Sequence, residues 1–185
     1  MTKLNLGCGE RHIDGYINID YKKSPAVDRV LDINNLDKEY HEYSIDVIYA
    51  SHVIEHFKRD NGNNILKQIY KVLKPSGIFR IAVPDWDAVV DRYKDTYDLE
   101  ELMRIIYGRP DAFGEGHYTI WTYGTLEKDL KDIGFRDVWE YDWRTTEHSY
   151  MDDFSRAHLP HDVEAIRTGK FDNHRLMSLN MEAVK

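Results

Sequence analysis

The chain has 185 residues, a formal net charge of −8 and one cysteine, Cys8. The single cysteine excludes a fold held together by internal disulfides, and the acidic balance argues against nonspecific binding to nucleic acid, which needs a basic surface. Because no apolar run approaches about 18 residues and the first residues lack the apolar stretch of a signal peptide, we expect a cytoplasmic protein that does not insert into a membrane.

Short apolar runs separated by polar turns fill the first part of the chain, and each run is predicted to form a buried strand. The runs cover residues 3–6, 16–19, 27–31, 45–50 and 78–83. Residues 63–73 are predicted to form a helix, because their apolar side chains recur at helical spacing and Pro75 follows. A strand, a helix and a further strand make a crossover unit, which favours a parallel sheet. The sequence therefore predicts an α/β fold with a doubly wound, mostly parallel sheet.

Beyond Pro84 the predicted elements are helices, a loop and two further strands. Helices are expected over residues 87–97, 99–107 and 125–133, a loop over 108–116, and strands over 135–141 and 176–184. Thr125 is the predicted N-cap of the third of these helices, and Gly134 is its C-terminal stop. The intervening stretch over 142–175 is polar and weakly periodic, and nothing in the composition marks a boundary between two domains.

Glycine or polar residues follow the predicted strands, where open α/β sheets bind their ligands. These strand-end residues are Gly7, Cys8, Gly9, Asp20, Asp32, Ser51 and His52. Glycine permits a positive φ and lets a ligand approach the backbone closely. A carboxylate at Asp20 can accept hydrogen bonds from two ribose hydroxyls. The sequence therefore predicts a nucleoside-shaped site at this edge of the sheet.

Together these motifs resemble the class I methyltransferases that depend on S-adenosylmethionine (SAM). The motifs are LNLGCG at residues 4–9, Asp20, Asp32, IYASHVIEH at 48–56, LKPSG at 73–77 and Phe135 after Ile133 and Gly134. Their order along the chain is far more specific than any one of them, since a lone Gly-x-Gly is weak. The resemblance is closest to a group of small bacterial methyltransferases of mostly unassigned substrate, and it implies the Rossmann-like fold of class I.

The resemblance implies SAM as the cofactor, S-adenosylhomocysteine as the product and a role for each strand-end residue. The amino-acid part of SAM would lie along Gly7, Cys8 and Gly9, its ribose against Asp20, its adenine beside Asp32 and Ile33, and its methionine end at Ser51 and His52.

The sequence departs from this family in the first crossover, where only residues 10–15 separate Gly9 from the second predicted strand. A parallel crossover usually needs about ten or more residues, so we expect the usual helix to be reduced to a turn. Because the first predicted strand starts at residue 3, we also expect none of the preceding helices that usually cover the substrate. We therefore expect a single domain over residues 1–185, with a cofactor-binding half at 1–83 and a helical and loop lid from 84–124 and 142–175.

Three candidate catalytic residues lie outside the cofactor motifs. His117 is the first, because an imidazole with an ordinary pKa near about 6.5 can accept a proton from a hydroxyl or an ammonium group. Asp85 follows the fifth strand, where a carboxylate could orient the acceptor, and Tyr16 follows the short glycine loop. Arg156 and Arg175 are candidates for binding a phosphate or carboxylate of the substrate, since guanidinium pairs bidentately with such groups. Solvated surface positions are the alternative interpretation for the histidine and the arginines.

The sequence HVIEH at residues 52–56 matches the H-x-x-E-H pattern of zinc proteases. On a helix, His52 and His56 would share a face and both bind zinc, with Glu55 as the base of a zinc hydrolase. The apolar run directly upstream instead predicts a strand ending at His52, which favours a turn and a helix start that supports the SAM pocket. A divalent metal held by Glu55 or His56 is a further alternative, and no metal is assigned.

The predicted function is transfer of a methyl group from SAM to an oxygen or nitrogen atom of a small polar acceptor. Such acceptors include a sugar, a nucleotide-sugar or a phospho-base such as phosphoethanolamine. A non-catalytic SAM-binding domain that regulates a partner is the alternative from a different class. An NAD-binding Rossmann protein is less consistent, because no third glycine follows Gly9. Residues 93–107, rich in Tyr, are interpreted as packing or a subunit contact, which leaves a homodimer open.

Overall fold

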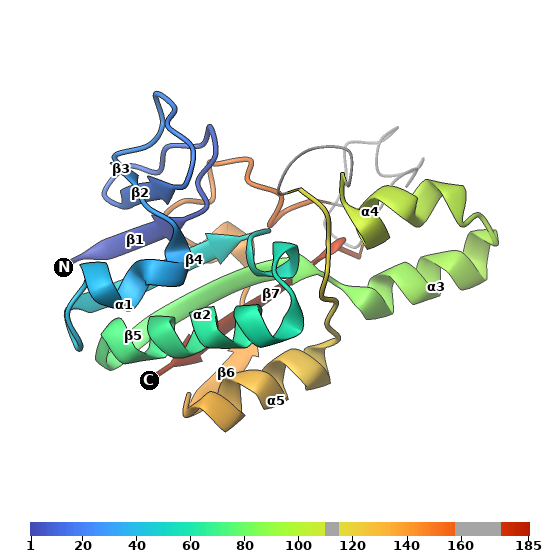
Figure 1. Ribbon diagram of the computed structural model, residues 1–185. Coiled ribbons are helices and arrows are strands. Elements are labelled where there is room, and N and C mark those ends of the chain that lie inside the picture. Colours follow the sequence, from blue (N-terminus) through green and yellow to red (C-terminus); the bar gives the residue numbers. More distant parts are fainter. Residues whose placement is uncertain (110–114, 158–174) are drawn as a thin grey trace.

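A seven-stranded sheet forms the centre of the protein in the computed structural model, which describes residues 1–109, 115–157 and 175–185 (Figure 1). The strands are β1 (Lys3–Leu6), β2 (Ile17–Asp20), β3 (Arg29–Val30), β4 (Ile45–Ser51), β5 (Leu73–Pro84), β6 (Asp137–Glu140) and β7 (Ser178–Val184). Their order is β3-β2-β1-β4-β5-β7-β6, with β1 to β5 parallel and β7 antiparallel to both of its neighbours. The predicted α/β fold with a mostly parallel sheet is confirmed.

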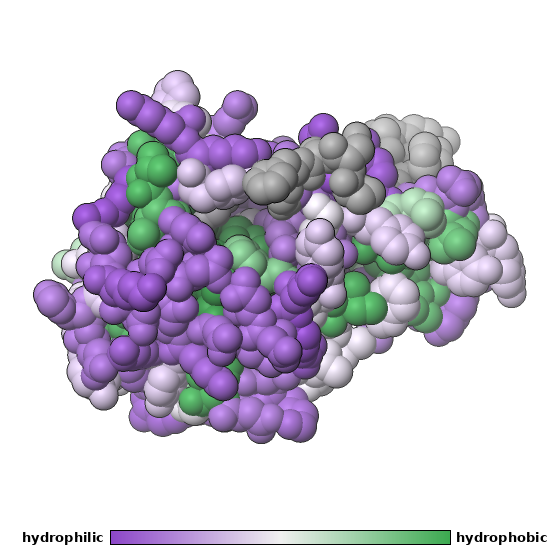
Figure 2. Space-filling view, viewed as in Figure 1, coloured by the Kyte–Doolittle hydropathy of each residue, from purple (hydrophilic) through white to green (hydrophobic). Residues whose placement is uncertain are grey.

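Three helices cover one face of this sheet: α1 (Leu36–Glu39), α2 (Arg59–Val72) and α5 (Tyr123–Ile133) (Figure 1). The core on this face combines alternate strand residues with the apolar stripes of the helices, including Leu4, Leu6, Ile48, Ala50, Phe79, Ile81, Leu36, Ile65, Ile69, Leu126 and Leu130. Their outer surfaces are hydrophilic in Figure 2, as expected for amphipathic helices on a sheet.

Two further helices, α3 (Trp86–Thr96) and α4 (Met103–Tyr107), project away from the end of β5 (Figure 1). Short 3₁₀ helices cover Ile33–Asn35, Ile54–His56, Glu100–Leu102 and Trp143–Thr145. The projecting part exposes large apolar and aromatic side chains, among them Tyr93, Tyr97, Leu99 and Tyr107. Among the described residues, no helix is long and apolar enough to span a membrane.

The opposite face of the sheet is covered without α-helices in the part of the chain that the structure describes. Its core cluster contains Ile13, Tyr16, Val47 and Tyr49, with Met151 packed against it. The covering residues therefore come from the turn before β2 and from the segment that follows β6.

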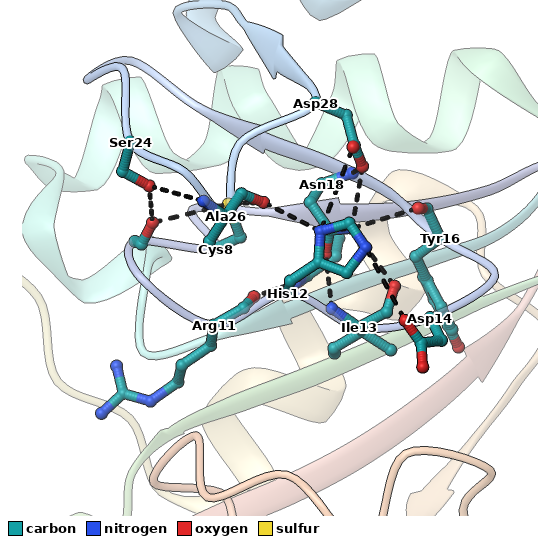
Figure 3. Close-up of polar contacts among 12 residues, drawn as sticks. Cys8, Arg11, His12, Ile13, Asp14, Tyr16, Asn18, Ser24, Ala26 and Asp28 are labelled. Carbon is teal, nitrogen blue, oxygen red and sulfur yellow. Dashed lines mark hydrogen bonds and ion pairs between the residues drawn. The ribbon is translucent and has the colours of Figure 1, made fainter.

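The first crossover is shortened, as predicted, and the described residues between β1 and β2 form turns and bends rather than a helix. The fully buried Asn18 organises this turn (Figure 3). Its Oδ1 accepts hydrogen bonds from Asn5 Nδ2 and from the backbone N–H of Ile13, both at 2.9 Å. Its Nδ2 donates to Asp28 Oδ2 at 2.9 Å and to the backbone carbonyl of Tyr16 at 3.1 Å. One amide side chain thus satisfies backbone groups that a helix would otherwise satisfy.

Several predicted boundaries were wrong. The strand predicted over 78–83 extends over Leu73–Pro84, and the helix predicted over 99–107 is a 3₁₀ helix, Glu100–Leu102, followed by α4. Two further differences have a clear local cause. Helix α2 begins at Arg59 rather than at residue 63, because its first turn is polar and carries no apolar spacing. The N-cap of α5 is Thr122, not Thr125. Thr122 Oγ1 accepts from the Thr125 N–H at 3.3 Å, and Thr125 Oγ1 accepts from the Thr122 N–H at 2.9 Å. Thr125 is therefore the N3 member of a capping box, a position that threonine can also fill.

Candidate active site

The glycine turn after β1 is closed on one side and open on the other. Gly7 has a φ of +65° and Gly9 a φ of +56°, so both adopt the left-handed conformation that favours glycine. A Cβ atom on Gly7 would lie 2.4 Å from Cγ2 of Val53, whereas a Cβ on Gly9 would meet no atom within 4 Å. Gly7 thus permits close packing against Val53, and Gly9 presents its backbone to open space that a ligand can occupy.

Asp20 ends β2 directly beside this turn and is buried. Its Oδ2 accepts from the Gly9 N–H at 2.9 Å, and its Oδ1 accepts from the Lys22 N–H at 2.8 Å. Each carboxylate oxygen has further lone-pair capacity. The carboxylate is therefore held rigidly at the carboxyl end of β2 with acceptor sites left for a hydroxyl pair.

Cys8 lies between the two glycines and is buried. Burial, together with the nearby carboxylates of Asp20 and Asp28, raises the pKa of its thiol to about 11. The thiol is therefore protonated at neutral pH, which agrees with packing rather than nucleophilic chemistry.

Asp32 and Ile33 follow β3 at the same edge of the sheet. The Leu31 N–H donates to the backbone carbonyl of Asp20 at 2.9 Å, which ties this segment to β2. The Asp32 side chain caps the next 3₁₀ helix by accepting from the Asn34 N–H at 2.9 Å. Ile33 is buried in the main core cluster. The structure thus brings Asp32 and Ile33 to the edge that carries Asp20.

Ser51 and His52 close the next strand end, and the segment after residue 150 lies against them. Ser51 Oγ donates to the backbone carbonyl of Asp153 at 2.7 Å. His52, at a φ of +53°, places Nε2 2.5 Å from Ser178 Oγ, and its ring lies 5.8 Å from that of Phe154. Sequence reasoning missed Asp153 and Phe154, because the stretch that contains them is polar and only weakly periodic.

The same segment reaches across to the first turn of the chain. Arg11 Nε donates to the backbone carbonyl of Asp152 at 2.5 Å, and its guanidinium lies 4.4 Å from the centre of the Phe154 ring. Residues 152–154 therefore join the shortened first crossover to the ends of β4 and β7. Of the predicted lid, residues 110–114 and 158–174 lie outside the described part of the chain.

A second group of side chains gathers next to His52. Glu55 is fully buried, and its Oε1 lies 3.0 Å from His52 Nδ1. Burial opposes ionisation of this carboxyl, but the close contact with His52 and the nearby imidazoles of His56 and His117 outweigh it and lower the pKa of Glu55. One ligand atom each of Glu55, His56 and His117 lies within 4.8 Å of the others. The sequence did not predict that His117 joins this pair.

The pattern H-x-x-E-H does not form the single helical face that a zinc protease needs. His52 has left-handed backbone geometry, and only Ile54–His56 form a 3₁₀ turn. The zinc-hydrolase alternative is therefore wrong in its geometry. Glu55 and His56 lie in this helical turn after β4, as expected, and α2 begins separately at Arg59.

His117 lies in a segment that packs between Glu55 and the start of α3. The Tyr118 N–H donates to the backbone carbonyl of Glu55 at 2.8 Å, and the Trp86 N–H donates to that of Trp121 at 3.0 Å. His117 Nδ1 lies 2.9 Å from the backbone carbonyl of Ile105, and burial lowers the pKa of its imidazole. A neutral ring with its proton on Nδ1 leaves the lone pair on Nε2.

Of the other predicted site residues, Asp85 and Arg175 contact each other, whereas Arg156 and Tyr16 each contact other side chains. Arg175 Nη2 lies 3.2 Å from Asp85 Oδ2. Arg156 instead lies 3.6 Å from Asp152 and over the ring of Trp143. Tyr16 precedes β2, at the opposite end of that strand from Asp20, and its hydroxyl donates to Glu147 at 2.9 Å. Its catalytic role stays a prediction that this position does not favour.

A family model described as a methyltransferase domain matches residues 3–140 of the chain. Among curated proteins, the sterol 24-C-methyltransferase of Debaryomyces hansenii is 33% identical over 107 residues, covering 58% of this chain and 26% of the relative. The sterol 24-C-methyltransferase of Candida albicans is 31% identical over 172 residues, covering 77% of this chain and 42% of the relative. The chain thus spans less than half the length of these curated relatives.

Solved structures share the fold at lower identity. A SAM-dependent methyltransferase from Archaeoglobus fulgidus has a TM-score of 0.59 and 20% identity, covering all of this chain and 86% of the other. The 1,6-didemethyltoxoflavin-N1-methyltransferase of Burkholderia thailandensis, solved with S-adenosylhomocysteine, has a TM-score of 0.58 and 15% identity, covering all of this chain and 70% of the other. The sheet and helices described above are therefore those of the class I fold, as the sequence predicted.

Proposed function

This chain belongs to the methyltransferase-domain family, and we propose that it transfers a methyl group from SAM to an oxygen or nitrogen atom of a small polar acceptor. The observation that carries the cofactor assignment is the pairing of Asp20 with Gly9. A buried carboxylate is fixed there by a backbone N–H of the glycine turn, at the strand ends where open α/β sheets bind ligands. S-adenosylhomocysteine is the expected product.

In this proposal SAM lies across the strand ends from β3 to β4. Its ribose hydroxyls would donate to Asp20, and its adenine would lie beside Asp32 and Ile33. Its amino-acid part would lie over the open face of Gly9, with the neighbouring backbone of Gly7 and Cys8, and its methionine end would reach Ser51 and His52. The open space above Gly9 supports this order of contacts.

Methyl transfer from SAM requires the protein to align the reacting atoms more than to activate them. The sulfonium of SAM already activates the methyl group, so the protein has to bring the acceptor atom, the methyl carbon and the sulfur into line. A hydroxyl acceptor also needs a base. His117 fits that role, because its lowered pKa keeps the imidazole neutral and its Nδ1 contact with Ile105 leaves Nε2 to take the proton.

Charged side chains near the end of β5 support a polar acceptor. Asp85 and Arg175 form an ion pair there that can bind a hydroxyl, an amine or a phosphate. In the proposal, residues 84–124 and 142–175 form the lid over this acceptor, and Arg156 contacts it from the second of these segments. Residues 1–83 form the cofactor-binding half of the single domain.

A sterol or another apolar acceptor is the second candidate. It is favoured by the identity of 31–33% to two proteins named sterol 24-C-methyltransferase. Against it, the buried carboxylate of Glu55 lies beside His56 and His117, and an apolar acceptor would give this group no polar partner.

The proposal is tested in two steps. Binding of S-adenosylhomocysteine is measured by calorimetry for the wild-type chain and for D20N, with NAD as the control ligand. We expect binding of the methyltransferase product alone, and at least a tenfold loss in D20N. Transfer of labelled methyl from SAM is then measured with sugars, phosphoethanolamine and a sterol. Binding of NAD in place of S-adenosylhomocysteine would overturn the proposal, and binding without transfer to any acceptor would favour a regulatory domain.

A further inference from the structure

The carboxylate of Glu55 is buried without sufficient partners. The side chain has no solvent exposure, and neither of its oxygens receives a hydrogen bond of good geometry from the described residues. His52 is a close polar neighbour, and its Nδ1 lies 3.0 Å from Oε1. A buried carboxylate without full compensation is costly, so Oε2 needs a cation or a proton donor.

Two imidazoles face this carboxylate, and both are oriented by the backbone. His56 Nδ1 lies 3.1 Å from the carbonyl of Gly116, and His117 Nδ1 lies 2.9 Å from the carbonyl of Ile105. A proton on each Nδ1 would leave each Nε2 with a free lone pair. Histidines that bind metals are typically held in this way, with the second ring nitrogen donating to a carbonyl or carboxylate.

Gly108 keeps space beside one of these rings. A Cβ atom at residue 108 would lie 2.7 Å from Cδ2 and 3.0 Å from Nε2 of His117. The same Cβ would lie 2.3 Å from the backbone carbonyl oxygen of Glu115, so a larger residue would disturb both this loop backbone and the imidazole. The φ of +66° at Gly108 also favours glycine at this position.

We propose that Glu55, His56 and His117 bind one divalent transition-metal ion, through one oxygen and two nitrogens. Their ligand atoms lie within 4.8 Å of one another, and His56 and His117 are partly exposed, so an ion can reach them. Two histidines and one carboxylate form a ligand set used for catalytic zinc and for non-haem iron, which leaves coordination positions open. Tetrahedral ligands at zinc bond lengths lie about 3.4 Å apart, so binding would draw the three atoms together by at most about 1.4 Å.

His52 would support the metal site indirectly, by holding the Glu55 ligand in place. Its contact with Oε1 holds the carboxylate in place and leaves Oε2 for the ion. Because His52 also ends β4 in the proposed SAM site, the ion would lie next to the methionine end of the cofactor. An open coordination position there suits an acceptor hydroxyl, whose acidity the ion would raise. With the ion bound, His117 Nε2 is a ligand and not a free base, so the ion replaces the base proposed above in activating the hydroxyl. This catalytic role rests on the proposed function, whereas metal binding itself does not.

The test uses the full chain after metal removal by a chelator. Zn²⁺ binding is measured by calorimetry, and Co²⁺ binding by visible absorption bands that report nitrogen and oxygen coordination. We expect one ion per chain, with at least a tenfold weaker affinity in each of the variants H56Q, H117Q and E55Q. The matched control is H41Q, which changes an exposed histidine in another part of the chain and should leave the affinity unchanged.

Each outcome decides the proposal. No Zn²⁺ or Co²⁺ binding, or binding that H56Q and H117Q leave unchanged, would overturn it and assign any remaining affinity to adventitious sites. If E55Q does not fold, the two histidine variants still decide. Titration with S-adenosylhomocysteine separates the two proposals. Variants that lose the metal site should still fold and bind S-adenosylhomocysteine with unchanged affinity. If the wild-type chain does not bind S-adenosylhomocysteine, the cofactor proposal fails independently of the metal site.

Discussion

Arg175 Nη2 lies 3.2 Å from Asp85 Oδ2, which joins the start of the last described segment to the end of β5. The same guanidinium also pairs with Asp91 on α3. Asp85 in turn caps α3, since its Oδ1 accepts from the Asp87 N–H at 3.0 Å. One carboxylate therefore orients both a helix and an arginine at the proposed acceptor site.

Replacement of this arginine separates acceptor binding from cofactor binding. R175Q should raise KM for a polar acceptor about tenfold and leave the Kd of S-adenosylhomocysteine unchanged. Arg175 is 46% exposed, so we expect a stability loss below about 1 kcal/mol. Steady-state kinetics and calorimetry provide the two measurements. An equal loss of affinity for cofactor and acceptor would show that the arginine supports the whole site rather than the acceptor.

The cap of α3 gives a matched pair of variants at Asp85. D85A removes the side-chain acceptor for the Asp87 N–H and should cost about 1 kcal/mol of unfolding free energy. D85N keeps an oxygen that caps equally well, so its stability should match the wild type. Urea unfolding measures both. Methyl transfer should fall in both variants if the carboxylate charge orients the acceptor, and D85N at full activity would remove that role.

Much of the sheet edge that carries the candidate site could be predicted, because buried parallel strands appear in the sequence as short apolar runs. Ile and Val runs located the five parallel strands, and the residues after them, such as Asp20 and His52, follow from the rule that strand ends meet at one edge. Neighbouring strand ends then place Asp20, Asp32 and Gly9 together without any knowledge of long-range contacts.

The rest of the candidate site depends on contacts between segments that are distant in the sequence, and no local pattern predicts these contacts. His117 reaches Glu55 because the Tyr118 N–H pairs with the Glu55 carbonyl, and no local pattern specifies that bond. The same holds for Phe154, which lies against His52. Tyr16 illustrates the opposite case: proximity to the glycine turn in sequence suggested a site role, but the strand carries its side chain to the amino end of the sheet.

Acid stability should depend on Glu147. Burial opposes its ionisation, but hydrogen bonds from Lys3 at 2.5 Å, Arg80 at 2.7 Å and Tyr16 at 2.9 Å outweigh it and lower the pKa of Glu147 well below 4.5. A carboxyl with a lowered pKa in the folded state stabilises it above the unfolded pKa, and this contribution is lost as the pH falls. The difference in unfolding free energy between wild type and E147Q should therefore be largest near neutral pH and shrink below about pH 4.5. A difference independent of pH would show that the carboxylate charge contributes nothing.

Gly7 and Gly9 offer the sharpest test of where a ligand lies, because they share a backbone conformation and differ in surroundings. Both have a left-handed φ, so alanine should cost each about 1 kcal/mol from strain alone. In G7A the new Cβ would also lie 2.4 Å from Val53, so we expect a larger loss of stability, on the order of 3 kcal/mol. In G9A the Cβ points into open space within the protein and would meet only a bound ligand. G9A should therefore unfold about 1 kcal/mol more easily yet lose at least tenfold in affinity for S-adenosylhomocysteine, measured by urea unfolding and calorimetry. Unchanged affinity in folded G9A would place the cofactor away from this glycine and contradict the proposed arrangement.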